Sequence, residues 1–297
     1  MRVLVTGAAG FIGSRLCEAL LRHGHEVMGV DDLSTGRAEN VSPAVQFVVG
    51  DVVEMPSLGP VDLIYHCAAS YRDRDAWELD ARTNLLGTIR VVREAQRWKA
   101  RLVYFQTSLC YGLAPASPVQ LDAPLAPQGS YAVSKTAAES YIRDSGLAYV
   151  SLRLANMYGP RNLSGPIPVF YRRLSEGLSC TVVDSRRDFV FIDDLVWVAV
   201  RAGADGYGPY HIASGSDVPI RAVYGAVASA MGLSVAAPEI QPRAPDDAPS
   251  ILLDPSETER VFGWTAQTPL EIGIAKAIEW YRANGVTQTF THLAMKG

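Results

Sequence analysis

Residues 6–13, which read Thr-Gly-Ala-Ala-Gly-Phe-Ile-Gly, decide the fold of this chain. They follow a short apolar run at 3–5 and lead into residues 11–22, where apolar side chains recur at helical spacing. Gly7, Gly10 and Gly13 therefore stand where a buried strand, expected over 3–6, turns sharply into a helix. A turn of this kind directs the N–H groups of the helix N-terminus at a phosphate group. Its position favours a dinucleotide-binding turn over a glycine-rich turn without a ligand.

The N-terminal half repeats this alternation of strand and helix. Continuous apolar runs predict further strands at 25–30, 45–49, 62–67, 102–106 and 149–154, and helical spacing predicts helices at 83–98 and 131–144. Strands that are apolar along their whole length are typical of a parallel sheet covered on both faces. The sequence thus predicts an α/β fold with a Rossmann-type doubly wound parallel sheet.

The pattern loosens beyond residue 160. We expect a helix at 165–177, strands at 188–192 and 210–213, a proline-rich loop at 236–250 and a last helix at 270–283. We predict a nucleotide-binding domain made of residues 1–160 and 187–215. A smaller mixed α/β substrate-binding domain then comprises residues 161–186 and 216–297.

The composition is that of an ordinary globular protein. The chain has 297 residues, 48% of them hydrophobic, and its 27 Lys and Arg against 31 Asp and Glu give a net charge of −4. This weakly acidic balance argues against nucleic-acid binding, which usually needs a basic patch. No run approaches the roughly 20 apolar residues of a membrane-spanning helix, and no signal peptide precedes the first strand. We therefore expect no membrane association.

The four cysteines, Cys17, Cys67, Cys110 and Cys180, lie far apart in the sequence, without a C-x-x-C pair or a histidine at ligand spacing. Such isolated cysteines are most often small buried hydrophobic side chains. We expect a cytoplasmic enzyme without disulfides and without a metal site.

Acidic residues follow the second and third predicted strands. Asp31 and Asp32 end the second strand, and Asp31 stands 18 positions after Gly13. A carboxylate there accepts hydrogen bonds from the adenosine ribose and repels a 2′-phosphate, which favours NAD over NADP. Arg37 is the opposing signal, because it could pair with such a phosphate; we interpret it as solvated. Asp51 is a candidate for the adenine edge or, equally, a simple helix cap.

A Tyr-x-x-x-Lys pair stands at the start of the helix predicted over 131–144. The i, i+4 spacing places Tyr131 and Lys135 on one helix face. A phenol with a pKa near 10 is a poor base at pH 7, but a neighbouring ammonium and a nicotinamide cation favour its phenolate form. The chain has only four lysines, and Lys135 is the only one between 99 and 276. A surface pair without a function is therefore the weaker interpretation.

Thr107 comes directly after the strand predicted over 102–106. Ligands of parallel sheets bind at the carboxyl ends of the strands. A hydroxyl in this position can hydrogen-bond the same substrate oxygen that Tyr131 deprotonates.

Taken together, these motifs resemble the extended short-chain dehydrogenase/reductases, in the nucleotide-sugar epimerase/dehydratase branch that includes the UDP-galactose 4-epimerases. Residues 107–112 and 165–168 look most like bacterial O-antigen sugar enzymes of that branch. The resemblance covers nearly the whole chain, and its carriers are the turn at 6–13, Asp31 to Gly36, His66 to Ala69, Asn84 to Thr88, Tyr131 with Lys135, Asn156 to Arg161, and Arg187 to Phe189.

The resemblance implies a set of site residues. Thr107, Tyr131 and Lys135 would be catalytic, Asn84 would support the site, and Lys135 would also bond the nicotinamide ribose. The residues expected at the NAD cofactor are Gly7, Gly10, Phe11, Ile12, Gly13, Asp31, Asp32, Ser34, Thr35, Gly36, Asp51, Val52, Cys67, Ala68, Ala69, Asn84, Tyr131 and Lys135. Those expected at the sugar nucleotide are Thr107, Ser108, Asn156, Arg187 and Arg243.

The resemblance also implies a homodimer that pairs the helices at 83–98 and 131–144. Val91, Val92, Ala95 and Trp98 would supply an apolar stripe for that interface, unless they belong to the core.

The sequence departs from its relatives in two places. Dehydratases of this branch carry Asp-Glu after the catalytic threonine, whereas this chain has Ser108 and Leu109. Because a leucine cannot transfer protons, dehydration is disfavoured, and so is decarboxylation. Residues 183–186 replace the Gly-Asp-Gly turn of relatives, which leaves the base of the nucleotide open between uridine, thymidine or another.

These observations predict an NAD-dependent nucleotide-sugar 4-epimerase, with a UDP-sugar as the expected substrate. A 4-ketoreductase or dehydratase of the same fold is the alternative. A catalytically silent nucleotide sensor or scaffold is disfavoured, because Thr107, Tyr131 and Lys135 are all present.

Overall fold

A computed structural model describes residues 1–56, 58–71, 73, 75–113, 117–243 and 248–290. Its centre is a seven-stranded sheet in the order β10-β6-β5-β4-β1-β2-β3, with every neighbouring pair parallel. The sheet confirms the expected Rossmann-type fold. Its strands are β1 (Arg2–Thr6), β2 (Glu26–Asp31), β3 (Gln46–Val49), β4 (Leu63–His66), β5 (Arg101–Thr107), β6 (Tyr149–Leu154) and β10 (Gly208–Ile212).

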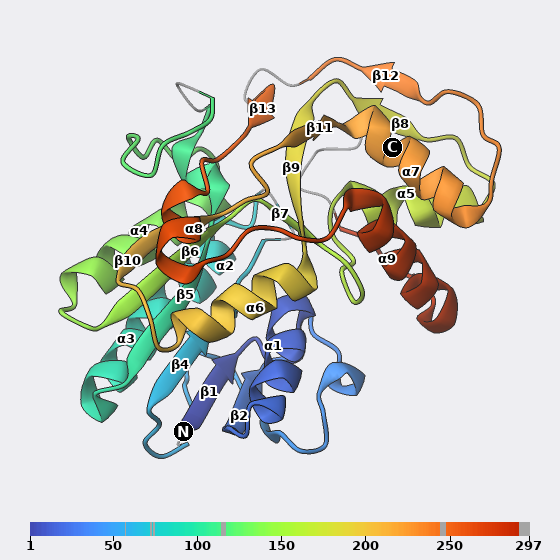
Figure 1. Ribbon diagram of the computed structural model, residues 1–297. Coiled ribbons are helices and arrows are strands. Elements are labelled where there is room, and N and C mark those ends of the chain that lie inside the picture. The colour runs from blue at the N-terminus through green and yellow to red at the C-terminus, as the bar shows by residue number, and fades with distance from the viewer. Residues whose placement is uncertain (57, 72, 74, 114–116, 244–247, 291–297) are drawn as a thin grey trace.

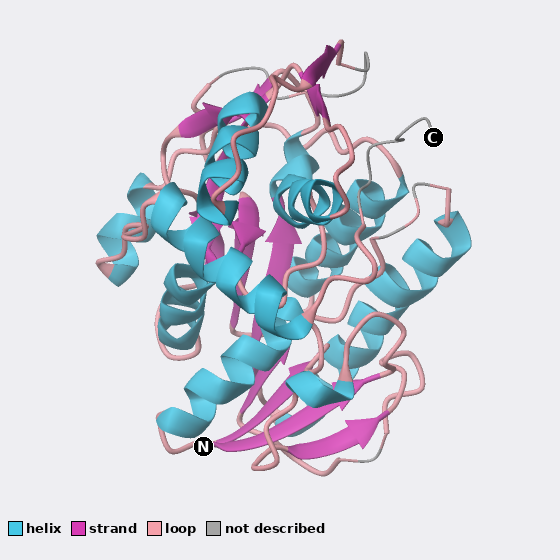
Figure 2. Cartoon of the chain, turned by 90° about the vertical axis from the view of Figure 1, so that its right-hand side faces the viewer, coloured by secondary structure: helices cyan, strands magenta, loops and turns pink. Residues whose placement is uncertain are grey.

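Helices cover both faces of this sheet (Figures 1 and 2). Consecutive side chains of a strand point to opposite faces, and in β1 Val3 and Val5 join one core cluster while Leu4 joins the other. α1 (Phe11–Arg22) and α6 (Ile192–Ala202) supply the first cluster, whereas α3 (Gly87–Trp98) and α4 (Ser130–Asp144) supply the second. Burial on both faces explains why the strands are apolar along their whole length.

The helix predicted over 83–98 begins earlier and is not uniform. It starts as α2 (Trp77–Asp80), continues as a π-helical segment, η2 (Ala81–Leu86), and then becomes α3. Val91, Val92 and Ala95 of α3 are at most 7% exposed and pack under the sheet. Of the two alternatives left open for the apolar stripe, these three residues fit the core, and Trp98 is partly buried against the same cluster.

A smaller region lies over the carboxyl ends of the large sheet (Figure 1). Strand β9 (Arg186–Phe191) is paired with β7 (Asn156–Tyr158), β11 (Asp217–Pro219) and β13 (Ser250–Ile251), and β8 (Thr181–Val183) is paired with β12 (Glu239–Gln241). β12 falls inside the segment 236–250 that we expected to be a loop, of which 244–247 lie outside the described residues. The remaining helices are α5 (Pro166–Ser175), α7 (Ile220–Met231), α8 (Ser256–Phe262) and α9 (Leu270–Asn284), with short 3₁₀ turns at η1 (Ala38–Asn40) and η3 (Ser108–Tyr111).

The chain crosses between the two regions more than once. β10 returns to the large sheet beside β6, whereas β9 hydrogen-bonds strands of the small sheet. The predicted domain boundaries at 160, 187 and 215 stay a prediction. Across the described ranges, no helix combines the length and the apolar character that a membrane span requires.

Candidate active site

One cavity of about 690 Å³ opens between the two regions, above the carboxyl ends of the parallel strands. Its walls come from the glycine-rich turn, the ends of β2, β4 and β5, the start of α4, and the residues that follow β6. The small region closes it through α5, β8 and β9. The carboxyl edge of a parallel sheet is where such folds bind ligands, so the position of the cavity agrees with the sequence argument.

The glycine-rich turn forms the floor of one half of this cavity. A Cβ on Gly13 would stand 2.0 Å from the carbonyl oxygen of Gly7, and a Cβ on Gly7 would stand 2.7 Å from the backbone N of Ala68. Gly10 caps α1 without any side-chain hydrogen bond to the helix N-terminus. The first N–H groups of α1 therefore face the cavity edge uncapped, which fits the pyrophosphate of a dinucleotide.

The carboxylates after β2 shape the turn as well as the cavity. Asp31 is 7% exposed and accepts hydrogen bonds from the backbone N of Ala9 at 3.0 Å and of Leu33 at 2.8 Å. Burial raises its pKa above the usual range. Asp32 is exposed and accepts from the backbone N and the Oγ of Ser34. Asp31 therefore holds the turn in place at the point where a ribose would lie.

Asp51 and Arg37 lie on the cavity wall near these carboxylates. Asp51 accepts from the backbone N of Val53 at 2.8 Å and is ion-paired with Arg82. No helix of the described chain begins there, so the bond to Val53 closes a short turn. The helix-cap interpretation of Asp51 was therefore wrong.

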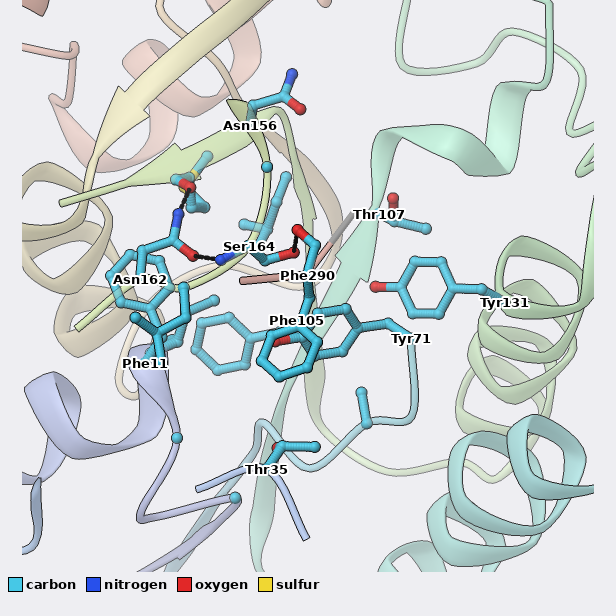
Figure 3. A pocket seen from close by; sticks show the side chains of 18 of the residues that line it. Phe11, Thr35, Tyr71, Phe105, Thr107, Tyr131, Asn156, Asn162, Ser164 and Phe290 are labelled. Carbon is cyan, nitrogen blue, oxygen red and sulfur yellow. Dashed lines mark hydrogen bonds between the residues drawn. The ribbon is translucent and has the colours of Figure 1, made fainter. Parts of the chain in front are cut away.

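Tyr131, Lys135 and Thr107 meet at the other half of the cavity. Figure 3 shows the ring of Tyr131 projecting from α4 into the cavity, with Thr107 at the end of β5. Lys135 is 2% exposed, and its Nζ lies 4.0 Å from the centre of the Tyr104 ring. Thr107 is 9% exposed, and its Oγ1 accepts from the backbone N of Leu109 at 3.2 Å. The structure thus brings the three residues singled out from the sequence to one place.

Burial controls the ionisation of Tyr131 and Lys135 when no cofactor is bound. It lowers the pKa of Lys135 to about 7. It raises the pKa of Tyr131, and Tyr71 and Asp80 nearby add to the same effect. In the protein without cofactor, burial therefore opposes the phenolate form, because removing a phenolate from water is costly. The expectation that an ammonium and a nicotinamide cation together favour the phenolate stays a prediction.

Asn84 supports the start of α4 from behind the cavity wall. Its Nδ2 donates to Ser134 Oγ at 3.0 Å and to the carbonyl of Ser70, whose backbone N donates to Asn84 Oδ1. Ser134 Oγ in turn donates to the carbonyl of Tyr131. The amide of Asn84 therefore links the loop after β4 to the first turn of α4.

A buried polar network ties the turn after Thr107 to the far side of α4. Arg153 forms an ion pair with Glu139, and its Nη1 donates to the Tyr111 hydroxyl at 2.6 Å. His211 Nδ1 contacts the carbonyl of Asp254, so that nitrogen carries the proton and Nε2 accepts from the Tyr111 hydroxyl at 2.6 Å. The network works only while His211 is neutral, and burial lowers the pKa of His211 to about 4.

This network predicts acid sensitivity. An unfolded histidine titrates near 6.5, so between pH 6.5 and 4 the unfolded chain binds a proton that folded His211 does not. The free energy of unfolding therefore falls as the pH falls through this window, by on the order of 3 kcal/mol for His211 at pH 4. Burial also lowers the pKa of His66, to about 3, so His66 further lowers the free energy of unfolding as the pH falls. Urea unfolding at a series of pH values measures the slope.

The matched variants are His211→Asn and, at an exposed histidine, His23→Gln. His211→Asn should flatten the slope by about one proton between pH 6.5 and 4, while His23→Gln should leave it as it is. Equal slopes in the His211 variant and the unmodified chain would contradict the assignment.

Most of the predicted site residues line the cavity, and three do not. Gly36 lies beneath the turn, where a Cβ would stand 2.8 Å from both Ala9 Cβ and Asp31 Oδ1, and Asn84 lies behind the wall. Arg243 is exposed and is not among the described residues that line the cavity. The residues that do line it are Gly7, Gly10, Phe11, Ile12, Gly13, Asp31, Asp32, Ser34, Thr35, Asp51, Val52, Cys67, Ala68, Ala69, Thr107, Ser108, Tyr131, Lys135, Asn156 and Arg187.

Two of the expected substrate residues are already held by backbone carbonyls. Asn156 Nδ2 donates to the carbonyl of Asp188 at 3.0 Å. Arg187 Nη1 donates to the carbonyls of Arg186 and Ala248. These bonds fix both side chains at the cavity wall, where guanidinium and amide N–H groups can meet a phosphate.

The sequence argument missed several lining residues. Tyr71 lies beside Tyr131 with ring centres 6.3 Å apart, and its position after the end of β4 was an available signal. Phe290 lines the cavity because its backbone N donates to Leu163 and its carbonyl accepts from Gly165. No local pattern could have indicated Phe290, since its partners lie more than 120 residues away.

Comparison with protein-family models matches residues 3–213 to the NAD-dependent epimerase/dehydratase family. The chain belongs to this family. The resemblance inferred from the motifs is thereby confirmed, and the protein is an NAD-dependent enzyme of this family.

Relatives match over nearly the whole chain. The UDP-glucose 4-epimerase of Mycolicibacterium smegmatis is 36% identical over 95% of this chain and 99% of its own. The solved structure of the Bordetella bronchiseptica enzyme WbmH with NAD⁺ is 47% identical, with a TM-score of 0.91 over 96% of this chain and 99% of that one. WbmG of the same organism, solved with NAD and UDP, is 39% identical, with a TM-score of 0.90 over 99% of both chains.

Proposed function

We propose that this member of the NAD-dependent epimerase/dehydratase family is a nucleotide-sugar 4-epimerase that retains its NAD between turnovers. The observation that carries the proposal is the composition of the reacting end of the cavity. Tyr131, Lys135 and Thr107 gather there, and the side chain of Leu109 lines the same wall. The site therefore has the phenol of Tyr131 beside the Lys135 amine for proton transfer at an alcohol, and a leucine where dehydration would need a further acid or base.

The proposed chemistry is a reversible oxidation at C4 of the sugar. Tyr131 Oη takes the proton from the 4-hydroxyl and later returns it, while Thr107 Oγ1 holds the same oxygen in place. NAD supplies a reversible hydride acceptor for C4 and a positive charge close to the phenol. Lys135 adds a second positive charge when protonated, which favours the phenolate against the effect of burial. For inversion at C4, the keto sugar would have to rotate within the cavity so that its opposite face receives the hydride.

We infer that Gly7, Gly10 and Gly13 hold the cofactor pyrophosphate and that Asp31 and Asp32 hold the adenosine ribose. The uncapped start of α1 and the position of both carboxylates support this arrangement. A carboxylate at this point also repels a 2′-phosphate, in favour of NAD.

We further infer a UDP-sugar as the substrate, with its diphosphate at Asn156 and Arg187. The solved complex of WbmG with NAD and UDP and the identity to a UDP-glucose 4-epimerase support uridine as the base. Arg243 is not among the described residues that line the cavity, so the cavity gives no support for its role in substrate binding.

A panel assay tests the proposal. The purified chain, without added cofactor, is incubated with UDP- and dTDP-sugars, and the products are examined by mass spectrometry and NMR. We expect an isomer of unchanged mass with inverted C4 from at least one UDP-sugar, because resident NAD is regenerated in each cycle. Turnover only after addition of NADH and a 4-keto sugar would replace the proposal with a 4-ketoreductase, and loss of water would replace it with a dehydratase.

We also propose a homodimer, formed through α3, α4 and the helical turns before them. The exposed apolar side chains there, rather than the buried stripe of α3, would make the interface. They are Trp77, Leu79, Leu86, Val133 and Tyr141, which are 41–65% exposed. Exposed apolar side chains gathered on neighbouring elements are typical of an interaction surface.

A further inference from the structure

A single buried amide connects the two elements that carry the reacting groups. Gln106, next to last in β5, is 1% exposed. Its Nε2 donates to the carbonyl of Lys135 at 3.1 Å, and its Oε1 accepts from the backbone N of Thr107 at 2.9 Å. One side chain thus bonds the backbone of Thr107 on the strand and the backbone of Lys135 on the helix.

The chemistry of the two partners fixes the orientation of this amide. The Lys135 carbonyl only accepts and the Thr107 N–H only donates, so a flipped amide would lose both hydrogen bonds. The Tyr104 hydroxyl donates to the same Lys135 carbonyl at 3.0 Å. Two buried donors from β5 therefore converge on the helical turn that carries Tyr131 and Lys135.

We propose that Gln106 is a positioning residue that sets the separation between the Thr107 hydroxyl and the Tyr131 phenol. Tyr131 is one helical turn before Lys135, so a bond at the Lys135 carbonyl fixes the turn on which Tyr131 stands. The bond to the Thr107 N–H fixes the start of η3, where the Thr107 side chain faces the cavity (Figure 3). This inference rests on the proposed function only in that these two hydroxyls meet one substrate oxygen.

The residue type is specific to this task. A glutamine side chain offers one donor and one acceptor at the end of two methylene groups, and both are used. A methionine fills a similar volume but makes neither bond. A glutamate keeps the volume and the acceptor for the Thr107 N–H, but its ionised form cannot donate to Lys135.

The test compares Gln106→Met with a matched variant, Gln96→Met. Gln96 on α3 also donates its Nε2 to a backbone carbonyl of the α4 region, that of Ser145 at 2.9 Å, but at the far end of the helix. Gln106→Met should lower kcat by about 10- to 100-fold, because small displacements of reacting groups are costly. The KM and the amount of bound NAD should stay within about threefold, since nothing that binds either is removed. Gln96→Met should leave all three unchanged.

Gln106→Glu covers the case in which the methionine variant does not fold. At a pH high enough to ionise the buried carboxyl, it should lower kcat in the same direction with KM unchanged, because the carboxylate cannot donate to the Lys135 carbonyl. A role in stability alone predicts a different pattern, in which the melting temperature falls while kcat per folded molecule is preserved. That pattern in either variant would overturn the proposal.

The kinetic assay uses whichever sugar nucleotide the unmodified chain converts. If that reaction proves to be a ketoreduction, the proposed epimerase function is wrong, but the role of Gln106 can still be tested with the same substrate. Crystal structures of the unmodified chain and of Gln106→Met give a readout without substrate. We expect the separation of Thr107 Oγ1 and Tyr131 Oη to change by about 1 Å in the variant. An unchanged separation would overturn the inference even if no substrate were known.

Discussion

Tyr131→Phe should lower turnover of the sugar nucleotide by at least about 10²-fold while the purified protein keeps its bound NAD. Proton transfer by a positioned side chain contributes typically 10²–10⁴-fold, and the variant removes only the hydroxyl that carries it out. The ring remains, so its contacts at the cavity wall with Tyr71 persist. Steady-state rates give the loss, and the absorbance of NAD released on denaturation gives the cofactor content.

Tyr141→Phe is the matched control, because Tyr141 lies on the same helix and is 54% exposed. It loses the same atom at a place far from the cavity lining, and we expect its kcat and NAD content to equal those of the unmodified chain. Activity retained in Tyr131→Phe would show that another group transfers the proton and would remove the catalytic assignment.

Gly13→Ala should yield a folded protein with little bound NAD. The added methyl group would meet the carbonyl oxygen of Gly7 at 2.0 Å and its carbon at 2.8 Å. Both are backbone atoms of the turn, so the clash is relieved only by moving the turn that faces the cofactor. Overpacking of this kind costs typically about 1–3 kcal/mol, and we expect NAD to be held about 10²-fold less tightly. Fluorescence titration with NAD measures the dissociation constant.

Gly225→Ala is the control for the glycine-to-alanine change itself. Gly225 lies in α7, is exposed, and a Cβ there would meet no atom within 4 Å. This variant should be more stable by roughly 0.5–1 kcal/mol, because alanine loses less backbone freedom in a helix. Undiminished NAD affinity in Gly13→Ala would place the pyrophosphate away from the turn.

The sequence predicted the secondary-structure elements that depend on residues close together in the chain. The strand and helix around Gly7 and Gly13 begin and end within a residue of the prediction, because apolar spacing and turn glycines act locally. Helices α6, α7 and α8 were not predicted. β12 could not be found in a proline-rich segment, because its partner β8 lies more than 50 residues earlier.

The candidate site divides in the same way. Thr107, Tyr131 and Lys135 could be selected because each stands at a strand end or one helical turn from its partner. Arg243 was selected from the resemblance alone, and it is not among the described residues that line the cavity. The sequence did not single out Gln106, because its proposed role depends on hydrogen bonds to two backbone groups, one of which lies 29 residues away in the chain.

The sequence by itself therefore determined the parallel sheet, the glycine-rich turn between its first strand and helix, and the choice of Thr107, Tyr131 and Lys135 as candidate catalytic residues. The tertiary structure alone decided their electrostatic state, because burial lowers the pKa of Lys135 and raises that of Tyr131. It also decided that the stripe of α3 is core and that one amide joins strand to helix. Desolvation and hydrogen bonds between distant segments depend on the packed chain, and no spacing along the sequence encodes them directly.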